Sequence, residues 1–468
     1  MRRPRLGLIV PFVSFYEPII ALRREKEAFA ARLGQTLRQI CDLTDAGLVE
    51  SEADACQAGE QFARAEVDGV VVAPALAVFG ALPWAALRDL PRHLPVAIWH
   101  HAPLRTVPPD YDIRALIRSS GGLGVMALAN TLAREGRVFR VFCSHNEEGV
   151  PAPLLRFAAG ARAAALVRRA RLALVGTVFP QMIDVQMDAA NWALVTGADV
   201  IAITASEFAA VCQSVSESEL EAAVREVRAR HAVGDISDDE LRRSMRLAVA
   251  LDRLVEERRL SGGAFNCHGE NCLQNPALGV TGCYAVTKQT SAGRPFSCTG
   301  DLPTAVALIL AKQLAGVAIY GEMDLVDEER DCVLLANGGE GDAALSAEPM
   351  QIFGNENFTG MNGRGASVSV IVPQASATLL SFTPMSRNRY RLVVAEGAFD
   401  PHIKTALKGF HAGFRFAGKS AHRGFQDWCE AGATHHLAAT TGWWADTLRL
   451  VCELFGWEAH IIAEHEEA

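Results

Sequence analysis

Two stretches made almost entirely of apolar residues constrain the fold more than any other feature. They read VDGVVVAP at Val67–Pro74 and LPVAIW at Leu94–Trp99. Neither stretch alternates apolar with polar residues, which is typical of strands buried on both faces of a parallel sheet. Helical patterns lie between such stretches, and this alternation predicts βαβ units and a doubly wound N-terminal domain.

The length of the chain and its later patterns predict three domains. A chain of 468 residues is too long for a single hydrophobic core, because a domain usually contains roughly 150 residues. After Ala347 short stretches alternate apolar and polar residues, and helical patterns almost vanish until Trp444–Phe455, which favours an antiparallel barrel. We expect an N-terminal α/β domain (1–168), a central α/β domain carrying acidic turns (169–326) and a β-rich C-terminal domain with a His-His motif (327–468). The expected fold is therefore two doubly wound Rossmann-like α/β domains followed by a mainly antiparallel β-barrel domain.

Composition limits the partners of the chain. Its formal net charge of −9 argues against nucleic acid or an anionic membrane as the main partner. No uncharged apolar stretch approaches the roughly 20 residues that a membrane-spanning helix needs. Pro11 interrupts the apolar run near the start and no cleavage site follows, so the run predicts a first strand rather than a secretion signal. Eleven scattered cysteines indicate thiols in a reducing compartment, and we expect a cytoplasmic protein.

A turn and a helix stand out near residue 300. The turn reads CTGD (298–301), and an apolar run (305–314) follows it. Asp301 at the cap, Pro303 in the first turn and Gly316 beyond the end are helix start and stop signals. The pattern predicts a helix that begins directly after an acidic turn.

Two short apolar strands are expected after this helix, and each leads into acidic residues. Val317–Tyr320 is followed by Glu322 and Asp324, and Cys332–Ala336 is followed by a turn that contains Glu340. Polar sites of α/β proteins usually lie at the carboxyl ends of strands. These carboxylates could therefore meet in one site, or they could be solvated loop charges.

Carboxylates and a late histidine pair form the most informative set of polar residues. They occur where a strand is expected to end, where a helix begins, or after a glycine in the last domain: Glu270, Asp301, Asp324, Glu340, His435 and His436. Carboxylates together with imidazole suit a divalent cation such as Mn²⁺. Such a site could polarise a carbonyl group while a neighbouring carboxylate moves a proton. The alternative is that the acids are separate surface residues and the histidines are structural.

Two other patterns carry weaker signals. Cys267, His268, Cys272 and Cys283 could bind zinc, but their spacing matches no common structural zinc pattern. The glycine-rich stretch Ser119–Gly124 lacks the spacing of phosphate-binding loops, so we expect a plain turn there before a helix.

The order and spacing of several segments resemble the L-fucose isomerase and L-arabinose isomerase superfamily. The segments that carry the resemblance span most of the chain: VDGVVVAP, LPVAIWHH, MIDVQMDAANWALVTGADVIAI, CTGDLPTAVALILAKQLAG with EMDL, RYRLVVAEG and GATHHLAATTGWWADTLRLVCELFGWE. Enzymes of this family interconvert aldoses and ketoses through an ene-diol with a divalent cation, usually Mn²⁺. The resemblance implies an aldose–ketose isomerase that acts on a sugar or sugar derivative and assembles as a homotrimer or homohexamer.

The resemblance also implies a role for each candidate residue. Asp324 and His436 match the metal ligands of the family. Asp301, Glu270 and Glu340 match other acidic residues of the family's active sites, and these three together with His435 are expected to be catalytic.

Two positions depart from the family pattern. Thr299 stands where the family usually has a glutamate, and a hydroxyl has neither the charge nor the pKa for that role. Asn337 lies near the position of a ligand histidine in the arabinose branch. Either Glu270 or Glu340 takes over the missing role, or the function has changed. A changed function would be another metal-assisted enzyme, such as a lyase, epimerase or aldolase, or a non-catalytic sugar-binding protein.

Overall fold

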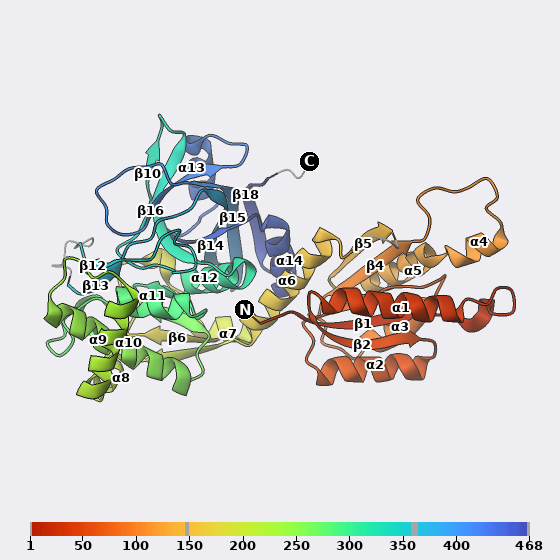
Figure 1. The fold of residues 1–468 in the computed structure, drawn as a ribbon, viewed down its shortest axis with the longest axis horizontal. Coiled ribbons are helices and arrows are strands. Elements are labelled where there is room, and N and C mark those ends of the chain that lie inside the picture. The colour runs from red at the N-terminus through yellow and green to blue at the C-terminus, as the bar shows by residue number, and fades with distance from the viewer. Residues whose placement is uncertain (1, 146–148, 357–363, 466–468) are drawn as a thin grey trace. The chain divides into compact units, whose positions relative to one another are not determined.

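The computed structural model describes residues 2–145, 149–356 and 364–465, and the chain forms two compact units (Figure 1). The first unit consists of Arg2–Ala165 together with Asp446–Gly456, and the second of Leu166–Ala445 together with Trp457–Ala468. Each unit contains its own parallel sheet. Among the described residues, no helix combines the length and the apolar composition that crossing a bilayer requires.

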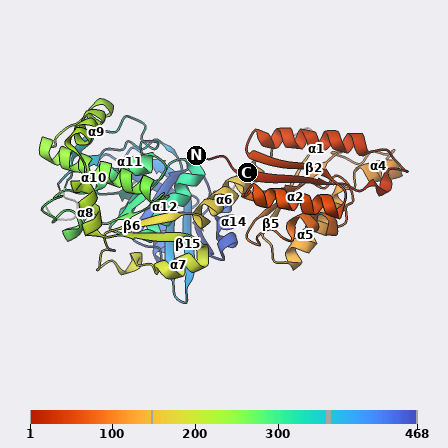
Figure 2. The same cartoon turned by 90° about the horizontal axis from the view of Figure 1, so that it is seen from below.

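The first unit has a five-stranded parallel sheet in the order β2-β1-β3-β4-β5. Its strands are β1 (Arg5–Pro11), β2 (Asp42–Val49), β3 (Gly69–Val72), β4 (Val96–Ala102) and β5 (Phe139–His145). Its helices are α1 (Arg23–Arg38), α2 (Glu52–Arg64), α3 (Ala81–Leu87), α4 (Ile113–Arg118), α5 (Gly121–Arg134) and α6 (Ala152–Arg168), with α14 (Ala445–Phe455) from the end of the chain. Figure 2 shows α1 and α2 on opposite faces of the sheet. The two apolar stretches form β3 and β4 in its interior, which confirms the prediction of a Rossmann-like parallel sheet.

The glycine-rich stretch at 119–124 is not the plain turn that the sequence predicted. Helix α5 already begins at Gly121 and passes close to the backbone that follows β3. A Cβ on Gly121 would lie 3.0 Å from the carbonyl oxygen of Pro74, and one on Gly124 would lie 2.8 Å from that of Leu76. These glycines therefore allow the start of the helix to pack closely against the backbone after β3. They are needed for this close approach and not for a turn.

The second unit contains a four-stranded parallel sheet in the order β7-β6-β8-β9. Its strands are β6 (Arg171–Val175), β7 (Asp199–Ile203), β8 (Gly262–Phe265) and β9 (Phe296–Cys298). The helices that connect them are α7 (Ala189–Thr196), α8 (Ala205–Gln213), α9 (Glu217–Arg230), α10 (Asp238–Glu257) and α11 (Cys283–Ser291). This second Rossmann-like sheet agrees with the expected central α/β region.

An antiparallel barrel of six strands follows in the same unit. Its strands are β10 (Ile319–Asp327), β11 (Cys332–Ala336), β14 (Ala375–Met385), β15 (Arg389–Asp400), β16 (His411–Phe416) and β17 (His436–Thr441). Their order is β14-β17-β10-β11-β16-β15, and β14 also pairs with β15, so the sheet closes on itself. Strand β18 (Glu458–Ala463) pairs with β15 in parallel, while β12 (Ile352–Gly354) and β13 (Ala366–Val368) form a separate pair. The barrel confirms the predicted β-rich region, and it reaches back to Ile319, upstream of residue 327.

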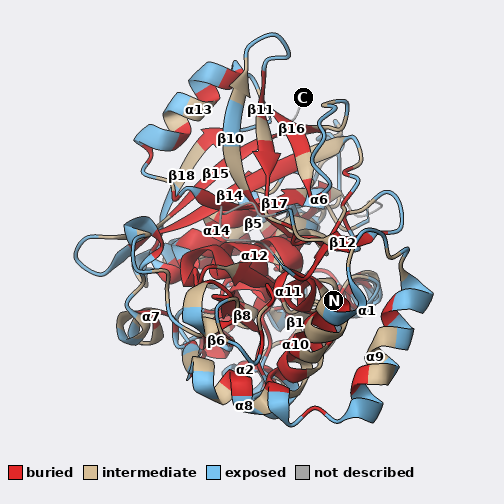
Figure 3. Cartoon of the chain, turned by 90° about the vertical axis from the view of Figure 1, so that its left-hand side faces the viewer, coloured by how far each residue is buried: buried red, intermediate tan, exposed pale blue. Residues whose placement is uncertain are grey.

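One prediction for this region was wrong. The stretch expected to be almost free of helices contains α13 (Ala421–Glu430). Its buried residues are Ala421, Gly424 and Trp428, while most of its other residues are exposed (Figure 3). Its buried residues at 421, 424 and 428 follow the i, i+3, i+7 spacing of an amphipathic helix, so the periodic signal is present in the sequence and the prediction missed it in a short segment between strands.

Helix α12 (Leu302–Ala315) connects the parallel sheet to the barrel. It begins after Asp301, whose side chain accepts the Thr304 N–H, and it ends at Gly316 in the left-handed conformation, as the sequence predicted. Almost every residue of α12 is buried (Figure 3), because it packs against β8 and β9 of the sheet and against β14 and β17 of the barrel. Its N-terminus therefore brings the 298–301 turn to the junction of sheet and barrel.

Candidate active site

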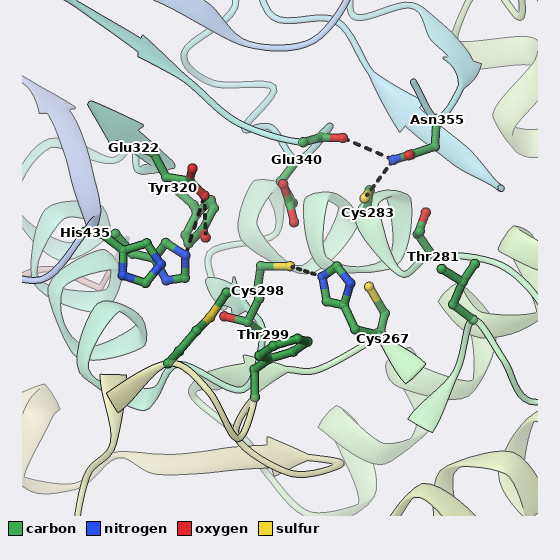
Figure 4. Close-up of a pocket in the computed structure, with 16 residues that line it drawn as sticks. Cys267, Thr281, Cys283, Cys298, Thr299, Tyr320, Glu322, Glu340, Asn355 and His435 are labelled. Atoms are coloured by element: carbon green, nitrogen blue, oxygen red, sulfur yellow. Dashed lines mark hydrogen bonds and ion pairs between the residues drawn. The ribbon is translucent and has the colours of Figure 1, made fainter. Parts of the chain in front are cut away.

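A cavity of about 370 Å³ lies in the second unit, where the parallel sheet meets the barrel. Acids and imidazoles from both parts line it, and Figure 4 shows the carboxylates of Glu322 and Glu340 directed into the same space. The histidines that line it are His268, His435 and His436. The volume is within the lower part of the range for small-molecule sites, roughly 300–1,000 Å³.

Asp301 is held in place by three contacts at the start of α12. Its Oδ1 accepts the backbone N–H of Thr304 at 2.8 Å, and its backbone oxygen accepts the Ser297 hydroxyl at 2.5 Å. Its Oδ2 accepts a hydrogen bond from Nδ1 of His436 at 2.8 Å. Asp301 is fully buried and is absent from the cavity lining. Since both carboxylate oxygens are engaged, Asp301 orients His436 and does not reach into the cavity itself.

His436 stands opposite Glu322 in the ladder between β17 and β10. Nε2 of His436 is 3.5 Å from Oε1 of Glu322, which also accepts the Tyr320 hydroxyl at 3.3 Å. Burial disfavours the charged imidazole, but Asp301 and Glu322 outweigh it and raise the pKa of His436 above its ordinary value. The cavity therefore faces an imidazole that is held in one orientation and holds its proton more tightly than a free imidazole does.

Glu340 is the most enclosed acid of the cavity. It lies in the turn after β11, which Asn337 organises by donating from its side-chain amide to the carbonyl oxygens of Tyr320 (2.7 Å) and Glu340 (3.2 Å). Oε2 of Glu340 is buried and has no hydrogen-bond partner. Burial raises the pKa of Glu340, although a hydrogen bond from Cys298 partly opposes this. A buried acid with one free oxygen and a pKa raised above its ordinary value has properties typical of a proton-transfer group.

Thr299 occupies a strained position in the cavity wall. Its φ of 53° lies in the left-handed region, which β-branched residues rarely adopt. Its hydroxyl oxygen is buried without a hydrogen-bond partner. The next residue, Gly300, has a φ of 78°, and a Cβ there would lie 2.6 Å from the Thr177 carbonyl oxygen. The tight approach of the turn to Thr177 explains the glycine, and strain of this kind is concentrated at functional sites.

His435 lies at the open side of the cavity. Its Nδ1 is 2.6 Å from Oδ2 of Asp184, and its ring centroid is 3.8 Å from that of His436. Burial would raise the pKa of Asp184, but the hydrogen bonds from His435 reverse this and lower it. His435 is therefore half-exposed and packs against His436, but it takes no part in the buried hydrogen bond between Asp301 and His436.

The structure brings together four of the six residues selected from the sequence. Glu340, His435 and His436 line the cavity, and Asp301 supports His436 from behind. Asp324 and Glu270 do not line the cavity, and both are exposed.

Strand register explains why Glu322 and not Asp324 meets His436. Glu322 pairs directly with His436, and the register of β10 shifts between Met323 and Leu325, at a bulge around Asp324. In the sequence, Glu322 is recognisable only as one of several acids after the strand. A periodic pattern cannot reveal which of two acids faces a distant histidine, because register depends on pairing with the partner strand.

Cys298 is a further residue of the site that the sequence analysis did not select. Donor atoms of Cys267, His268 and Cys298, which all line the cavity, lie within 4.8 Å of one another. Sγ of Cys298 is 3.9 Å from Nε2 of His268. A hydrogen bond between the two thiols lowers the pKa of Cys267 and raises the pKa of Cys298, which burial raises further. The earlier zinc candidates Cys272 and Cys283 are not in this cluster.

The structure does not bring together the two residues predicted to bind Mn²⁺, Asp324 and His436. Asp324 is exposed and outside the cavity, so it does not join His436. Within the part of the chain that the structure describes, the one cluster of three His, Cys, Asp or Glu donors is Cys267, His268 and Cys298. Mn²⁺ prefers carboxylate and other oxygen ligands, whereas this cluster offers two sulfurs. This cluster therefore does not fit the predicted cation, and a Mn²⁺ site stays a prediction.

No family model matches the chain, and no curated protein matches its sequence.

Proposed function

We propose that this protein is an enzyme that interconverts aldose and ketose forms of a sugar by proton transfer through an ene-diol. One observation carries the proposal. A single cavity holds a buried acid with a free oxygen, Glu340, together with an imidazole, His436, that a buried carboxylate orients. Two titratable groups with different environments are what acid–base catalysis on adjacent carbons requires.

Glu340 is the proton-transfer group of the proposal. Its raised pKa keeps it basic enough to take a proton from the carbon next to a carbonyl and acidic enough to return the proton to the neighbouring carbon. Its free Oε2 is the oxygen available for this exchange.

His436 is the proposed stabiliser of the developing oxyanion. In its protonated form Nε2 can donate to a substrate oxygen, because Nδ1 is already engaged with Asp301. The hydroxyl of Tyr320 donates to Glu322 instead, and burial raises the pKa of Tyr320 so that it stays neutral. Asp301 acts as a positioning residue, since it reaches the substrate only through His436.

The cavity favours an uncharged substrate. None of the described residues that line it is lysine or arginine, which are the usual partners of phosphate and carboxylate groups. Carboxylates and an amide, by contrast, accept and donate hydrogen bonds to hydroxyl groups. These features favour an unphosphorylated polyhydroxy carbonyl compound. The homotrimeric or homohexameric assembly and the cytoplasmic location implied earlier remain predictions.

The proposal is tested by incubating the full chain with a panel of unphosphorylated aldoses and ketoses and identifying products by NMR. We expect one aldose–ketose pair to interconvert. Glu340→Gln should slow the reaction by about 10²–10⁴-fold, and Glu348→Gln, which changes an exposed glutamate outside the cavity, should not. Cleavage of the sugar into smaller products would contradict the proposal in favour of a lyase. Ligand-induced stabilisation without any product would contradict it in favour of a binding protein.

A further inference from the structure

The cluster of Cys267, His268 and Cys298 in the cavity wall has nearly the geometry of ligands around one metal ion. A tetrahedral zinc with bonds of about 2.3 Å to sulfur and about 2.0 Å to nitrogen holds those two donors about 3.5 Å apart. Sγ of Cys298 and Nε2 of His268 are 3.9 Å apart, and all three donors of the cluster lie within 4.8 Å of one another. Only small side-chain movements separate this arrangement from a coordinated one.

The fold explains how residues far apart in the sequence form this cluster. Strands β8 and β9 are parallel neighbours, and Phe265 pairs with Cys298 in their ladder. Cys267 and His268 follow directly after β8, so they leave the sheet at the edge where Cys298 ends β9. The third ligand therefore comes from the adjacent strand end, which is why the spacing in the sequence resembles no common zinc motif.

Buried polar atoms with unsatisfied bonding capacity provide a second observation. His268 is 8% exposed, and its Nδ1 has no hydrogen-bond partner. Oε2 of Glu340, which lies in the same cavity, also has no partner. Buried polar atoms are rarely left unpaired, because each one loses its hydration without replacement. A metal-bound water would donate to Oε2 of Glu340, whereas Nδ1 of His268 lies outside the cluster because Nε2 is the ring nitrogen that faces Cys298.

We propose that Cys267, His268 and Cys298 bind one zinc ion, with the fourth coordination position facing the cavity. Two thiolates and an imidazole are borderline-soft donors that favour Zn²⁺ over Mn²⁺. Three protein ligands with an open fourth position are typical of catalytic rather than structural zinc. Glu340 lies on the cavity side, where a substrate oxygen or a water would complete the coordination.

This inference goes beyond the proposed isomerase, because it concerns metal binding and does not depend on which reaction occurs. Zinc binding can be measured on the full chain without a substrate. A failure of one claim therefore leaves the other intact.

The first experiment titrates Zn²⁺ into reduced, chelator-stripped protein in competition with a chromogenic chelator. We expect one equivalent to bind tightly, with release of about two thiol protons. Changing a residue that only hydrogen-bonds to a metal ligand weakens metal binding by up to about 100-fold. Cys298→Ser and Cys267→Ser remove ligands themselves, so each should weaken zinc binding by more than this. Cys283→Ser, a cysteine of the same cavity that lies outside the cluster, should bind zinc as the wild type does.

A second measurement on the wild type removes any dependence on the folding of variants. Co²⁺ bound by the proposed ligands should give thiolate-to-metal charge-transfer absorption and the visible bands of a tetrahedral site. Absence of stoichiometric zinc binding, or a cobalt spectrum without thiolate bands, would overturn the proposal. Equal zinc affinity of Cys298→Ser and Cys283→Ser would also overturn the proposal. So would a disulfide between Cys267 and Cys298 in the folded protein, if the reduced protein then failed to bind zinc.

Discussion

Nδ1 of His436 donates to Oδ2 of Asp301 at 2.8 Å, and both side chains are almost completely buried. The two residues are 135 positions apart and come from the barrel strand β17 and the cap of α12. The interaction therefore fixes the imidazole at the junction of the barrel and the parallel sheet. It also leaves Nε2 as the atom of His436 that can act on a substrate.

Asp301→Asn should lower the pKa of His436 while keeping the helix cap. The amide oxygen of asparagine can still accept the Thr304 N–H, but the charge that favours imidazolium is lost. If protonated His436 is the active form, activity falls as pH rises through its pKa. The basic limb of the kcat/KM profile should therefore move to lower pH in the variant, and kcat should fall. An unchanged basic limb would contradict this role of Asp301.

The same pair makes a pH-dependent contribution to stability. Because the folded protein raises the pKa of His436 above the unfolded value of about 6.5, the contribution is fully present below that pH. It is lost as pH rises through the folded pKa. The difference in free energy of unfolding between wild type and Asp301→Asn should therefore be largest in mild acid and should shrink at alkaline pH. Denaturant titrations across this range measure it, and a difference that grows with pH would refute the assignment.

Glu340→Gln should reduce catalytic activity and raise the stability of the folded protein at neutral pH. The folded protein raises the pKa of Glu340 above the unfolded value of about 4.3, so ionisation destabilises the fold as pH rises from there through the folded pKa. A neutral amide avoids this cost. We expect the variant to have a higher Tm than wild type at neutral pH, with the gain disappearing in acid. A lower Tm at neutral pH would mean that the charged carboxylate is compensated by a partner, such as a bound cation.

Thr299→Asn should stabilise the protein, because asparagine tolerates the left-handed conformation better than a β-branched residue. With a φ of 53°, relief of the strain should raise the free energy of unfolding by roughly 1 kcal/mol. Thermal denaturation measures the change, and Thr304→Asn, in the first turn of α12, provides a comparison with no such strain to relieve. A clear loss of stability in Thr299→Asn would show that the threonine side chain makes contacts that outweigh the strain.

A buried ion pair near the site should be important for folding. Lys312 Nζ in α12 lies 2.6 Å from Oδ2 of Asp342, which also accepts the Ala318 N–H at 2.9 Å. Both charged residues are buried. Removing one charge leaves the other uncompensated, so Lys312→Met should cost about 3–5 kcal/mol. The exposed Lys408→Met should cost little, and equal effects of the two substitutions would contradict the argument.

Features that depend on local patterns could be predicted from the sequence. The runs that form β3 and β4 are continuous and apolar, and α12 has its cap, proline and terminal glycine in the expected places. Strand β2, by contrast, is mostly half-buried and contains polar residues. Such an edge strand lacks the continuous apolar signal of an interior one.

The site could be predicted only in part, because it depends on pairing between distant segments. Asp301, Glu340 and His436 were recognisable as polar residues at element ends. The pairing of Glu322 with His436 and the meeting of Cys298 with Cys267 are set by strand register. No residue pattern within either segment encodes these partners.

The most direct test of proton transfer at Glu340 is the isomerisation reaction run in D₂O with the sugar identified by the panel. The account predicts a product that carries deuterium at the carbon next to the carbonyl, and loss of this incorporation in Glu340→Gln. A product formed at full rate that carries no deuterium at that carbon, even after many turnovers, would contradict the central claim.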